Sequence, residues 1–307
     1  SKIQKSLITK YYLCLMRFLL YSLSIIYGII TALRNSLFDY GILKSKTHNI
    51  PIICIGNLSL GGNGKTPHTN YITKLLSPNY KVAILSRGYG RKSSGFNYVE
   101  LDSAASAIGD EPLQLKLNSP NCIVAVNNNR NKGVEKILFD YPETNVILLD
   151  DGFQHRKIKA GLNIIVTPFY KPFIKDNLLP LGALRESAHE ATRADIILVS
   201  KTPKDANPTE KKGIIESLNL KAHQKGYFSS ITYHKYKCIE NNTKLENEQD
   251  YSITLVSGIA NPTPLVNHLE EQGRKVNLIK FADHHNYTSK DIENILLEHK
   301  KDKSIKK

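Results

Sequence analysis

Apolar residues along this chain gather in short continuous runs that are separated by longer mixed segments. Runs rich in Ile, Val and Leu, without regular polar alternation, are typical of strands buried on both faces of a sheet. Several of the intervening segments are long enough for helices, and this order predicts an α/β fold with a doubly wound parallel sheet. The predicted strands lie at 51–55, 81–85, 122–126, 145–149, 162–166 and 195–199, and the predicted helices at 66–76, 111–117 and 132–139.

A second, smaller apolar pattern lies near the C-terminal end. Residues 206–242 are polar and rich in lysine, and apolar runs return at 253–256 and 275–279. We therefore predict a core domain over residues 37–242 and a smaller C-terminal α/β subdomain over residues 243–307.

The first 36 residues form a pattern of their own. Residues 11–33 are strongly apolar, yet at helical spacing the polar and small residues share one stripe. A spanning helix needs about 20 apolar residues, and Arg17 leaves only residues 18–33 uninterrupted. We favour a membrane-associated helix on the bilayer surface, while a true span and a helix packed only on its own domain stay open. The stripe consists of Arg17, Tyr21, Ser24, Gly28, Thr31 and Asn35.

Composition narrows the classes of partner. The chain has 307 residues with 42 Lys and Arg against 28 Asp and Glu, a formal net charge of +14, which favours anionic partners. We expect no nucleic-acid partner, because no recognisable nucleic-acid-binding module is present. The four cysteines have no CxxC or metal-binding spacing, which indicates free thiols in a reducing compartment.

A glycine-rich stretch after the first predicted strand has the composition of a phosphate-binding loop. Glycines let backbone N–H groups face phosphates, the following helix adds its positive dipole end, and the Lys-Thr pair supplies a charge and a Mg²⁺ ligand. Serine stands where the motif usually has its first glycine, but the loop length is kept. The predicted nucleotide-binding residues are Ser59, Leu60, Gly61, Gly62, Asn63, Gly64, Lys65 and Thr66.

Two carboxylates follow the predicted strand at 145–149. Asp150 and Asp151 stand where ligands bind in open parallel sheets, and where a second anchor for Mg²⁺ belongs beside a phosphate-binding loop. The alternative is a buried strand followed by an ordinary Asp-Gly turn.

Further motifs occur in a fixed order. They are Gly-Asn-Leu-Ser at 56–59, Gly-Lys-Thr-Pro at 64–67, Ser-Arg-Gly-Tyr-Gly at 86–90, Gly-Asp-Glu-Pro at 109–112, Asp-Asp-Gly-Phe-Gln-His at 150–155, Leu-Pro-Leu-Gly at 179–182, Leu-Arg-Glu at 184–186, Arg-Ala-Asp at 193–195 and Phe-Ala-Asp-His-His-Asn-Tyr at 281–287. This ordered set resembles the tetraacyldisaccharide 4'-kinase family over about residues 20–290.

The resemblance implies transfer of the γ-phosphate of ATP to the 4'-hydroxyl of an acylated glucosamine disaccharide 1-phosphate in lipid A biosynthesis. It implies Mg²⁺ as cofactor, the membrane surface as a partner of the N-terminal helix, and the cytoplasmic face of the bacterial inner membrane as the location. Family members continue beyond the region of Ile305, so we expect the C-terminal subdomain to be truncated.

The resemblance also implies roles for single residues. Asp110 and His284 are expected to act together on the acceptor hydroxyl, because an aspartate held by a histidine can accept its proton. Without the resemblance, Asp110 would be interpreted as a helix N-cap, and His284 and His285 as surface histidines. Of the two histidines we favour His284.

The other candidates serve the nucleotide, the metal and the acceptor. Arg185 is expected near the nucleotide, and the metal ligands are expected to be Thr66, Asp150, Asp151 and Glu186. Arginine pairs with phosphate through two hydrogen bonds, but a surface salt bridge remains the alternative for either arginine on the acceptor side. The predicted acceptor-binding residues are Arg87, Arg130, Asn57 and His155.

One other class of function is compatible with the phosphate-binding loop. A regulatory P-loop NTPase hydrolyses nucleotide to drive a partner protein. Such a protein has no need for acceptor-side residues such as Arg87, Asp110 and His284 together with an interfacial helix. The sequence therefore favours the kinase.

Overall fold

The computed structural model describes the chain except for residues 1, 234–251, 260, 284 and 302–307, and it leaves out the side chains of residues 2–14, 300 and 301. The chain divides into two compact units, residues 1–231 and residues 232–307. The first unit ends eleven residues before the predicted domain boundary at 242. Its last strand, β8, lies within the polar, lysine-rich segment of residues 206–242.

The first unit is built on an eight-stranded sheet in the order β3-β4-β2-β5-β1-β6-β7-β8. All neighbouring strands are parallel except β3, which pairs antiparallel with β4 at one edge. The predicted doubly wound parallel sheet is confirmed. Its strands are β1 (Ile52–Gly56), β2 (Val82–Ser86), β3 (Asn97–Tyr98), β4 (Ile123–Val126), β5 (Val146–Asp150), β6 (Leu162–Pro168), β7 (Ile196–Ser200) and β8 (Lys225–Phe228).

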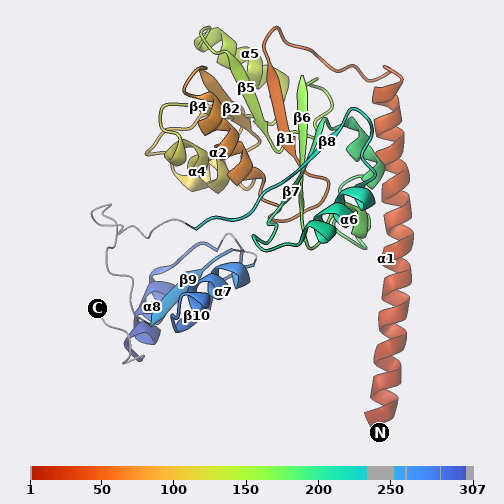
Figure 1. Cartoon of the computed structure of the whole chain (residues 1–307), viewed down its shortest axis with the longest axis vertical. Coiled ribbons are helices and arrows are strands. Elements are labelled where there is room, and N and C mark those ends of the chain that lie inside the picture. Colours follow the sequence, from red (N-terminus) through yellow and green to blue (C-terminus); the bar gives the residue numbers. More distant parts are fainter. Residues whose placement is uncertain (1, 234–251, 260, 284, 302–307) are drawn as a thin grey trace. The chain divides into compact units, whose positions relative to one another are not determined.

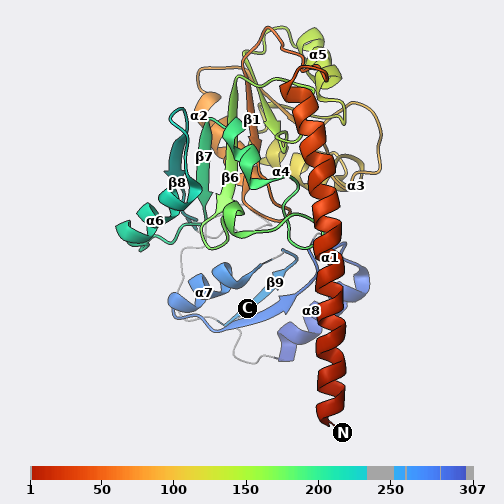
Figure 2. The same cartoon turned by 90° about the vertical axis from the view of Figure 1, so that its right-hand side faces the viewer.

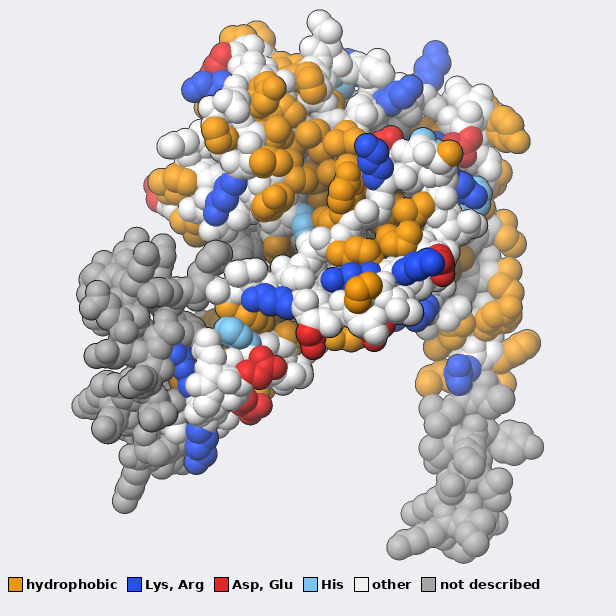
Figure 3. All heavy atoms as spheres, in the orientation of Figure 1, with side chains coloured by type: hydrophobic (Ala, Val, Ile, Leu, Met, Phe, Trp, Pro, Cys, Tyr) orange, Lys and Arg blue, Asp and Glu red, His pale blue; other side chains and the backbone are white. Residues whose placement is uncertain are grey.

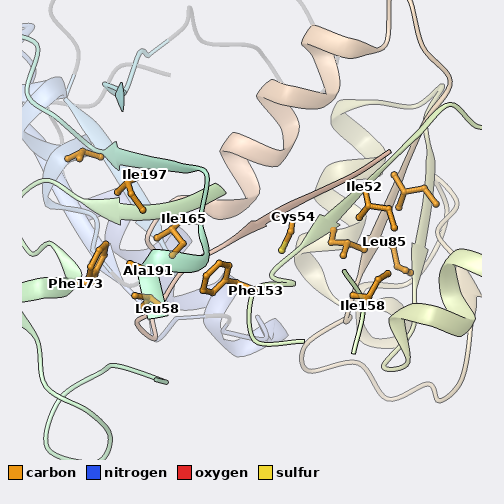
Figure 4. Close-up of a cluster of buried hydrophobic side chains, with 14 of the residues drawn as sticks. Ile52, Cys54, Leu58, Leu85, Phe153, Ile158, Ile165, Phe173, Ala191 and Ile197 are labelled. Carbon is orange, nitrogen blue, oxygen red and sulfur yellow. The ribbon is translucent and has the colours of Figure 1, made fainter. Parts of the chain in front are cut away.

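Two buried clusters lie on opposite faces of this sheet, because alternate side chains of a strand point to opposite faces. In β1, Ile52 and Cys54 join a cluster with residues of α5 and α6 (Figure 4), whereas Ile55 joins a cluster with residues of α2 and α4. Both faces are therefore covered, which is why the strands are continuous apolar runs. The helices are α2 (Lys65–Leu76), α3 (Ala105–Ile108), α4 (Asp110–Asn118), α5 (Arg130–Asp140) and α6 (Pro208–Leu218), with 3₁₀ turns η1 (Phe173–Lys175) and η2 (Ala188–Arg193).

A long N-terminal helix, α1 (Lys2–Asp39), lies along the side of the first unit (Figures 1 and 2). The polar stripe faces the protein from Ser24 to Asn35, which are both buried, whereas its first two members, Arg17 and Tyr21, are exposed. On other faces of the helix, Ile26, Ile30 and Leu33 are 55–61% exposed. Figure 3 shows this exposed face as a column of apolar side chains along α1. The segment Leu15–Asp39 is long and apolar enough to cross a membrane by length and composition, and only 6% of its apolar window is buried.

The second unit contains a parallel pair of strands and two helices. β9 (Ile253–Ser257) pairs with β10 (Val276–Lys280), and the connection between them contains α7 (Thr263–Glu271). α8 (Ser289–Lys301) follows β10. This is the small α/β arrangement that the two C-terminal apolar runs predicted.

Candidate active site

The phosphate-binding loop lies between β1 and α2, as predicted. Gly61 and Gly64 have φ angles of +103° and +93°, a left-handed backbone that glycine adopts without steric penalty. Gly64 is the N-cap of α2, so the first free N–H groups of the helix open towards the loop. Thr66 in the first turn is buried. The local sequence thus builds a glycine-rich turn that opens into the N-terminus of a helix, an arrangement suited to binding phosphate.

Asp150 lies directly beside this loop because β5 pairs with β1, with Asp150 opposite Ile55. Its carboxylate is 1% exposed and accepts hydrogen bonds from Thr69 Oγ1 at 2.9 Å and Ser86 Oγ at 3.4 Å. Burial, reinforced by the nearby charges of Glu111 and Asp151, raises the pKa of Asp150 to about 7. A buried carboxylate with a raised pKa is stabilised in its charged form by a cation that comes within contact distance.

Asp151 has a different environment although it is the next residue. Its φ of +51° is unusual for a non-glycine residue, and its carboxylate receives both guanidinium nitrogens of Arg185 at 2.8 and 3.1 Å. Lys65 Nζ lies 3.7 Å away. Burial opposes ionisation, but the hydrogen bonds from Arg185 and the charge of Lys65 prevail and lower the pKa of Asp151. Asp151 is therefore the permanently charged member of the pair.

Asn57 and Arg185 tie the loop to a segment 128 residues away in sequence. Arg185 donates to Asn57 O at 2.9 Å and also contacts Asn57 Oδ1, and Asn57 Nδ2 donates to Ser59 O at 2.6 Å. Backbone hydrogen bonds from Leu60 N to Ala183 O and from Arg185 N to Leu58 O, both 2.7 Å, run alongside. Asn57 is fully buried. Its side chain supports the loop, and its predicted contact with the acceptor stays a prediction.

Glu186, predicted as a metal ligand, occupies a buried network with 1% exposure. Its carboxylate accepts hydrogen bonds from Asn35 at 3.0 Å and Gln154 at 2.9 Å, and pairs with Arg193 at 2.9 Å. Asn35 belongs to α1, so this network attaches the N-terminal helix to the sheet domain. Glu186 can bind a metal only by exchanging these partners.

Three predicted acceptor residues lie around the carboxyl edge of the sheet. Arg130 is 2% exposed, its Nη1 donates to Asn127 O, and its Nε has no hydrogen-bond partner. Burial lowers the pKa of Arg130 to about 10, against the attraction of Asp150 and Asp151. Arg87, in contrast, is exposed at the end of β2.

His155 is partly buried, and its Nε2 has no hydrogen-bond partner. Burial and the neighbouring charges of Arg130 and Lys157 lower its pKa to about 4, so the ring is neutral near pH 7. It lines a cavity of about 620 Å³ with Phe38, Phe153 and Arg193.

Asp110 lies next to the Arg87 loop. The interpretation as an N-cap is wrong by one residue: Gly109 is the N-cap of α4 and Asp110 is its first residue. Gly109 has a φ of +96°, and a Cβ there would come within 3.0 Å of Tyr89 O and 3.3 Å of Gly88 Cα. This close approach brings the start of α4 against the loop that follows β2. Asp110 is exposed.

The second unit carries the predicted histidines. His284 lies outside the described residues. His285 pairs with Asp291 at 3.2 Å and stacks on Phe281 with ring centroids 4.7 Å apart. Its ring also contacts that of Tyr287 edge-on at 5.1 Å. His285 therefore has partners within its own unit.

Sequence reasoning missed several residues that support the site. Thr69 lies one turn beyond Thr66 on α2, so helical spacing places it on the same face of the helix, and the tertiary structure brings it to Asp150. Gln154 and Arg193 belong to the motifs at 150–155 and 193–195, but they bind Glu186 from separate segments, so their role has no local signal. Among the described residues, no group of three His, Cys, Asp or Glu side chains is arranged to hold a metal by itself.

The family comparison agrees with this geometry. Residues 16–306 match the family described as tetraacyldisaccharide-1-P 4'-kinase. The chain belongs to this family. It is 44% identical over 284 residues to the tetraacyldisaccharide 4'-kinase of Bacteroides fragilis, covering 90% of this chain and 76% of that protein. It is 41% identical over 283 residues to the enzyme of Flavobacterium johnsoniae, covering 92% and 82%.

A solved structure of the same family has the same fold. LpxK from Aquifex aeolicus in complex with ATP superposes with a TM-score of 0.72 at 32% identity, covering 89% of this chain and 84% of that chain. Membership of the tetraacyldisaccharide 4'-kinase family establishes the present chain as a kinase, and the predicted family is confirmed.

Proposed function

We propose that this kinase transfers the γ-phosphate of ATP to the 4'-hydroxyl of an acylated glucosamine disaccharide 1-phosphate. The observation that carries the proposal is the common position of the phosphate-binding loop and of Asp150 and Asp151 at one edge of the sheet, in a chain of this family. In the reaction, the hydroxyl oxygen attacks the γ-phosphorus, the bond to the β-phosphate oxygen breaks, and ADP leaves.

The residues present fit a bound Mg²⁺. Asp150 is buried, its carboxylate accepts hydrogen bonds from the hydroxyls of Thr69 and Ser86, and burial together with the charges of Glu111 and Asp151 raises its pKa. A hard oxygen-ligated cation supplies compensating positive charge. Thr66, Asp150 and Asp151 would hold it, and Mg²⁺ would neutralise charge on the phosphates. Glu186 stays a candidate ligand that must first release Asn35, Gln154 or Arg193.

Asp110 is the proposed acceptor of the hydroxyl proton, with His284 as its partner. Asp110 lies beside the Arg87 loop, and a cation there suits an anionic acceptor. His285 already has Asp291, Phe281 and Tyr287 as partners, which favours His284 for the role. Arg130 and His155 remain candidates for the acceptor side, because each retains a buried nitrogen without a partner.

The exposed apolar face of α1 suits a lipid acceptor. A helix on a membrane surface usually turns its apolar side to the bilayer and its polar side to water. In α1 the polar side contacts the protein instead of water, which leaves the apolar side available to the bilayer. We place the enzyme on the membrane surface through this face, at the cytoplasmic leaflet where ATP is present. A helix packed only on its own domain would bury those side chains, and α1 leaves them exposed.

The test of the function is phosphorylation of the disaccharide 1-phosphate lipid by purified protein in detergent, with Lys65→Ala as the inactive variant. Lys65 is directed at the loop and at Asp151, so its removal should abolish transfer without unfolding the protein. Near-parental turnover of Lys65→Ala at saturating ATP would contradict the assignment of the loop. ATP hydrolysis without lipid phosphorylation would favour the regulatory NTPase.

The proposed pair is tested by a double-mutant cycle. His284→Ala should lower kcat less than Asp110→Asn, because a residue that orients the base contributes less than the base. The double variant should lose less than the sum of the two single losses. Strictly additive losses in kcat would show that the two residues act independently.

A further inference from the structure

Three consecutive carbonyl groups of the phosphate-binding loop accept hydrogen bonds from side chains outside the loop. Lys201 Nζ donates to Gly62 O at 2.6 Å, and Ser200 Oγ donates to Asn63 O at 2.7 Å. His68 Nδ1 lies 2.6 Å from Gly64 O. Each of these carbonyls is therefore held by a side chain from outside the loop.

The donors come from the end of β7 and from α2. Ser200 is the last residue of β7 and Lys201 follows it, and Lys201 has a φ of +55°. A non-glycine residue rarely adopts this left-handed backbone unless its surroundings require it. Ser200 is 1% exposed, and its hydroxyl lies closer to Asn63 O of the loop, at 2.7 Å, than to its other acceptor, Thr167 O, at 3.4 Å.

The third donor is fixed by its own partner. A carbonyl oxygen can only accept, so His68 Nδ1 must carry the proton towards Gly64 O. Nε2 lies 2.8 Å from Ser229 Oγ, just beyond β8, and accepts from that hydroxyl when the ring is neutral.

We propose that Lys201, Ser200 and His68 are positioning residues that hold the phosphate-binding loop in its ligand-ready conformation. They are called the carbonyl clamp below. A trans peptide unit whose carbonyl is bound on one side presents its N–H on the other, so Ser200 and His68 orient the N–H groups of Gly64 and Lys65. Lys201 holds the preceding turn, in which Asn63 N donates to Gly61 O at 2.9 Å. The clamp thereby pre-organises the loop and reduces the entropy lost on binding. The inference rests on the proposed function, because it requires nucleotide in this loop.

The clamp predicts loss of nucleotide affinity without loss of the chemical step. Lys201→Met keeps the stem and removes the charged donor, and a hydrogen bond from a charged group to a partly exposed carbonyl corresponds to about a tenfold change. We expect the Kd of the non-hydrolysable ATP analogue AMPPNP and the KM of ATP to rise about tenfold. The kcat at saturating ATP should stay within about twofold of the parent.

Matched variants separate the clamp from general destabilisation. Lys204→Met removes an exposed lysine three residues away and should leave the Kd unchanged. His68→Asn retains an amide donor near the position of Nδ1 and should keep most of the affinity, whereas His68→Leu should lose it. Hydrogen exchange of the amides in residues 59–66 should accelerate in Lys201→Met, while exchange in β5 stays as in the parent.

The outcomes divide as follows. Parental AMPPNP affinity and loop exchange in Lys201→Met would overturn the clamp. A fall in kcat with unchanged AMPPNP affinity would also overturn it, because the lysine would then act on the transferring phosphate. Equal losses in His68→Asn and His68→Leu would remove His68 from it. If Lys65→Ala retains parental AMPPNP affinity, the loop assignment itself fails, and this result is distinct from a failure of the clamp.

Discussion

Replacing Asp150 with asparagine should stabilise the protein and abolish its activity. The carboxylate of Asp150 is 1% exposed, and the hydrogen bonds to it come from the hydroxyls of Thr69 and Ser86. Hydroxyls can donate or accept, so an amide of the same shape can be accommodated by rotation of these groups. Asp150→Asn therefore removes the cost of a buried charge while retaining the packing.

The magnitude follows from the pKa. Burial raises the pKa of Asp150 from 3.8 to about 7, so between those values the folded protein binds a proton that the unfolded chain has released. Since the folded state holds more protons, parental stability falls as pH rises through this window and levels off above the folded pKa. From pH 5 to pH 8 the fall amounts to about 2–3 kcal/mol, because each pKa unit corresponds to about 1.4 kcal/mol. Asp150→Asn lacks this loss.

The assay is thermal unfolding of the nucleotide-free protein at pH 5 and pH 8. For a unit of this size about 1 kcal/mol shifts Tm by about 2–4 °C, so the Tm advantage of Asp150→Asn should grow by about 4–12 °C between the two pH values. The attraction of Lys65 and Arg130 to Asp150 exists only when Asp150 is charged, so it is already contained in the pKa of Asp150 and adds no separate contribution. The pH-dependent difference therefore isolates Asp150.

Asp151→Asn is the matched control. The pKa of Asp151 is lowered, so this carboxylate is ionised throughout pH 5–8 and pairs with Arg185. Asp151→Asn should lower Tm by a similar amount at both pH values. A Tm difference between parent and Asp150→Asn that is the same at pH 5 and pH 8 would refute the reasoning.

Three further predictions concern the acceptor, the buried network and the helix. Asp110→Asn should lower kcat by about two to four powers of ten, while the Kd of AMPPNP and the Tm stay at the parental values. Parental turnover would mean that Asp110 has only a structural role in the first turn of its helix. Glu186→Gln should lower Tm by several degrees, because Arg193 loses a buried partner. This decrease should exceed that of Glu190→Gln, because the side chain of Glu190 is less buried. Equal decreases in Tm would contradict the network. The double variant Ile26→Gln with Ile30→Gln should sediment less with liposomes and have a higher KM for the lipid. Its Tm should stay near that of the parent, since both side chains are exposed. Unchanged sedimentation would rule out this face as the membrane contact.

The sequence by itself determined the elements and the chemistry that follows them. Continuous apolar runs gave strands within one or two residues of β1, β2, β4, β5, β6 and β7, because a strand buried on both faces tolerates no polar alternation. The glycine-rich loop and the Asp150-Asp151 pair were also visible, since their chemistry depends on spacing within a few residues. Strand β8 was missed because Lys225–Phe228 is short and its exposed and half-buried residues alternate.

Only the tertiary structure decided which of these segments meet. Neither the order of strands nor the pairing of Arg185 with Asp151 is encoded in local spacing, because crossover connections bring distant residues together. The sequence showed where the polar stripe of α1 lies, but packing decided that Ser24 and Asn35 contact the protein. The protein offers them backbone and carboxylate groups as hydrogen-bond partners, which lipid chains cannot do. Glu186 belongs to the same network for the same reason: a buried carboxylate is stable only where donors from several segments converge.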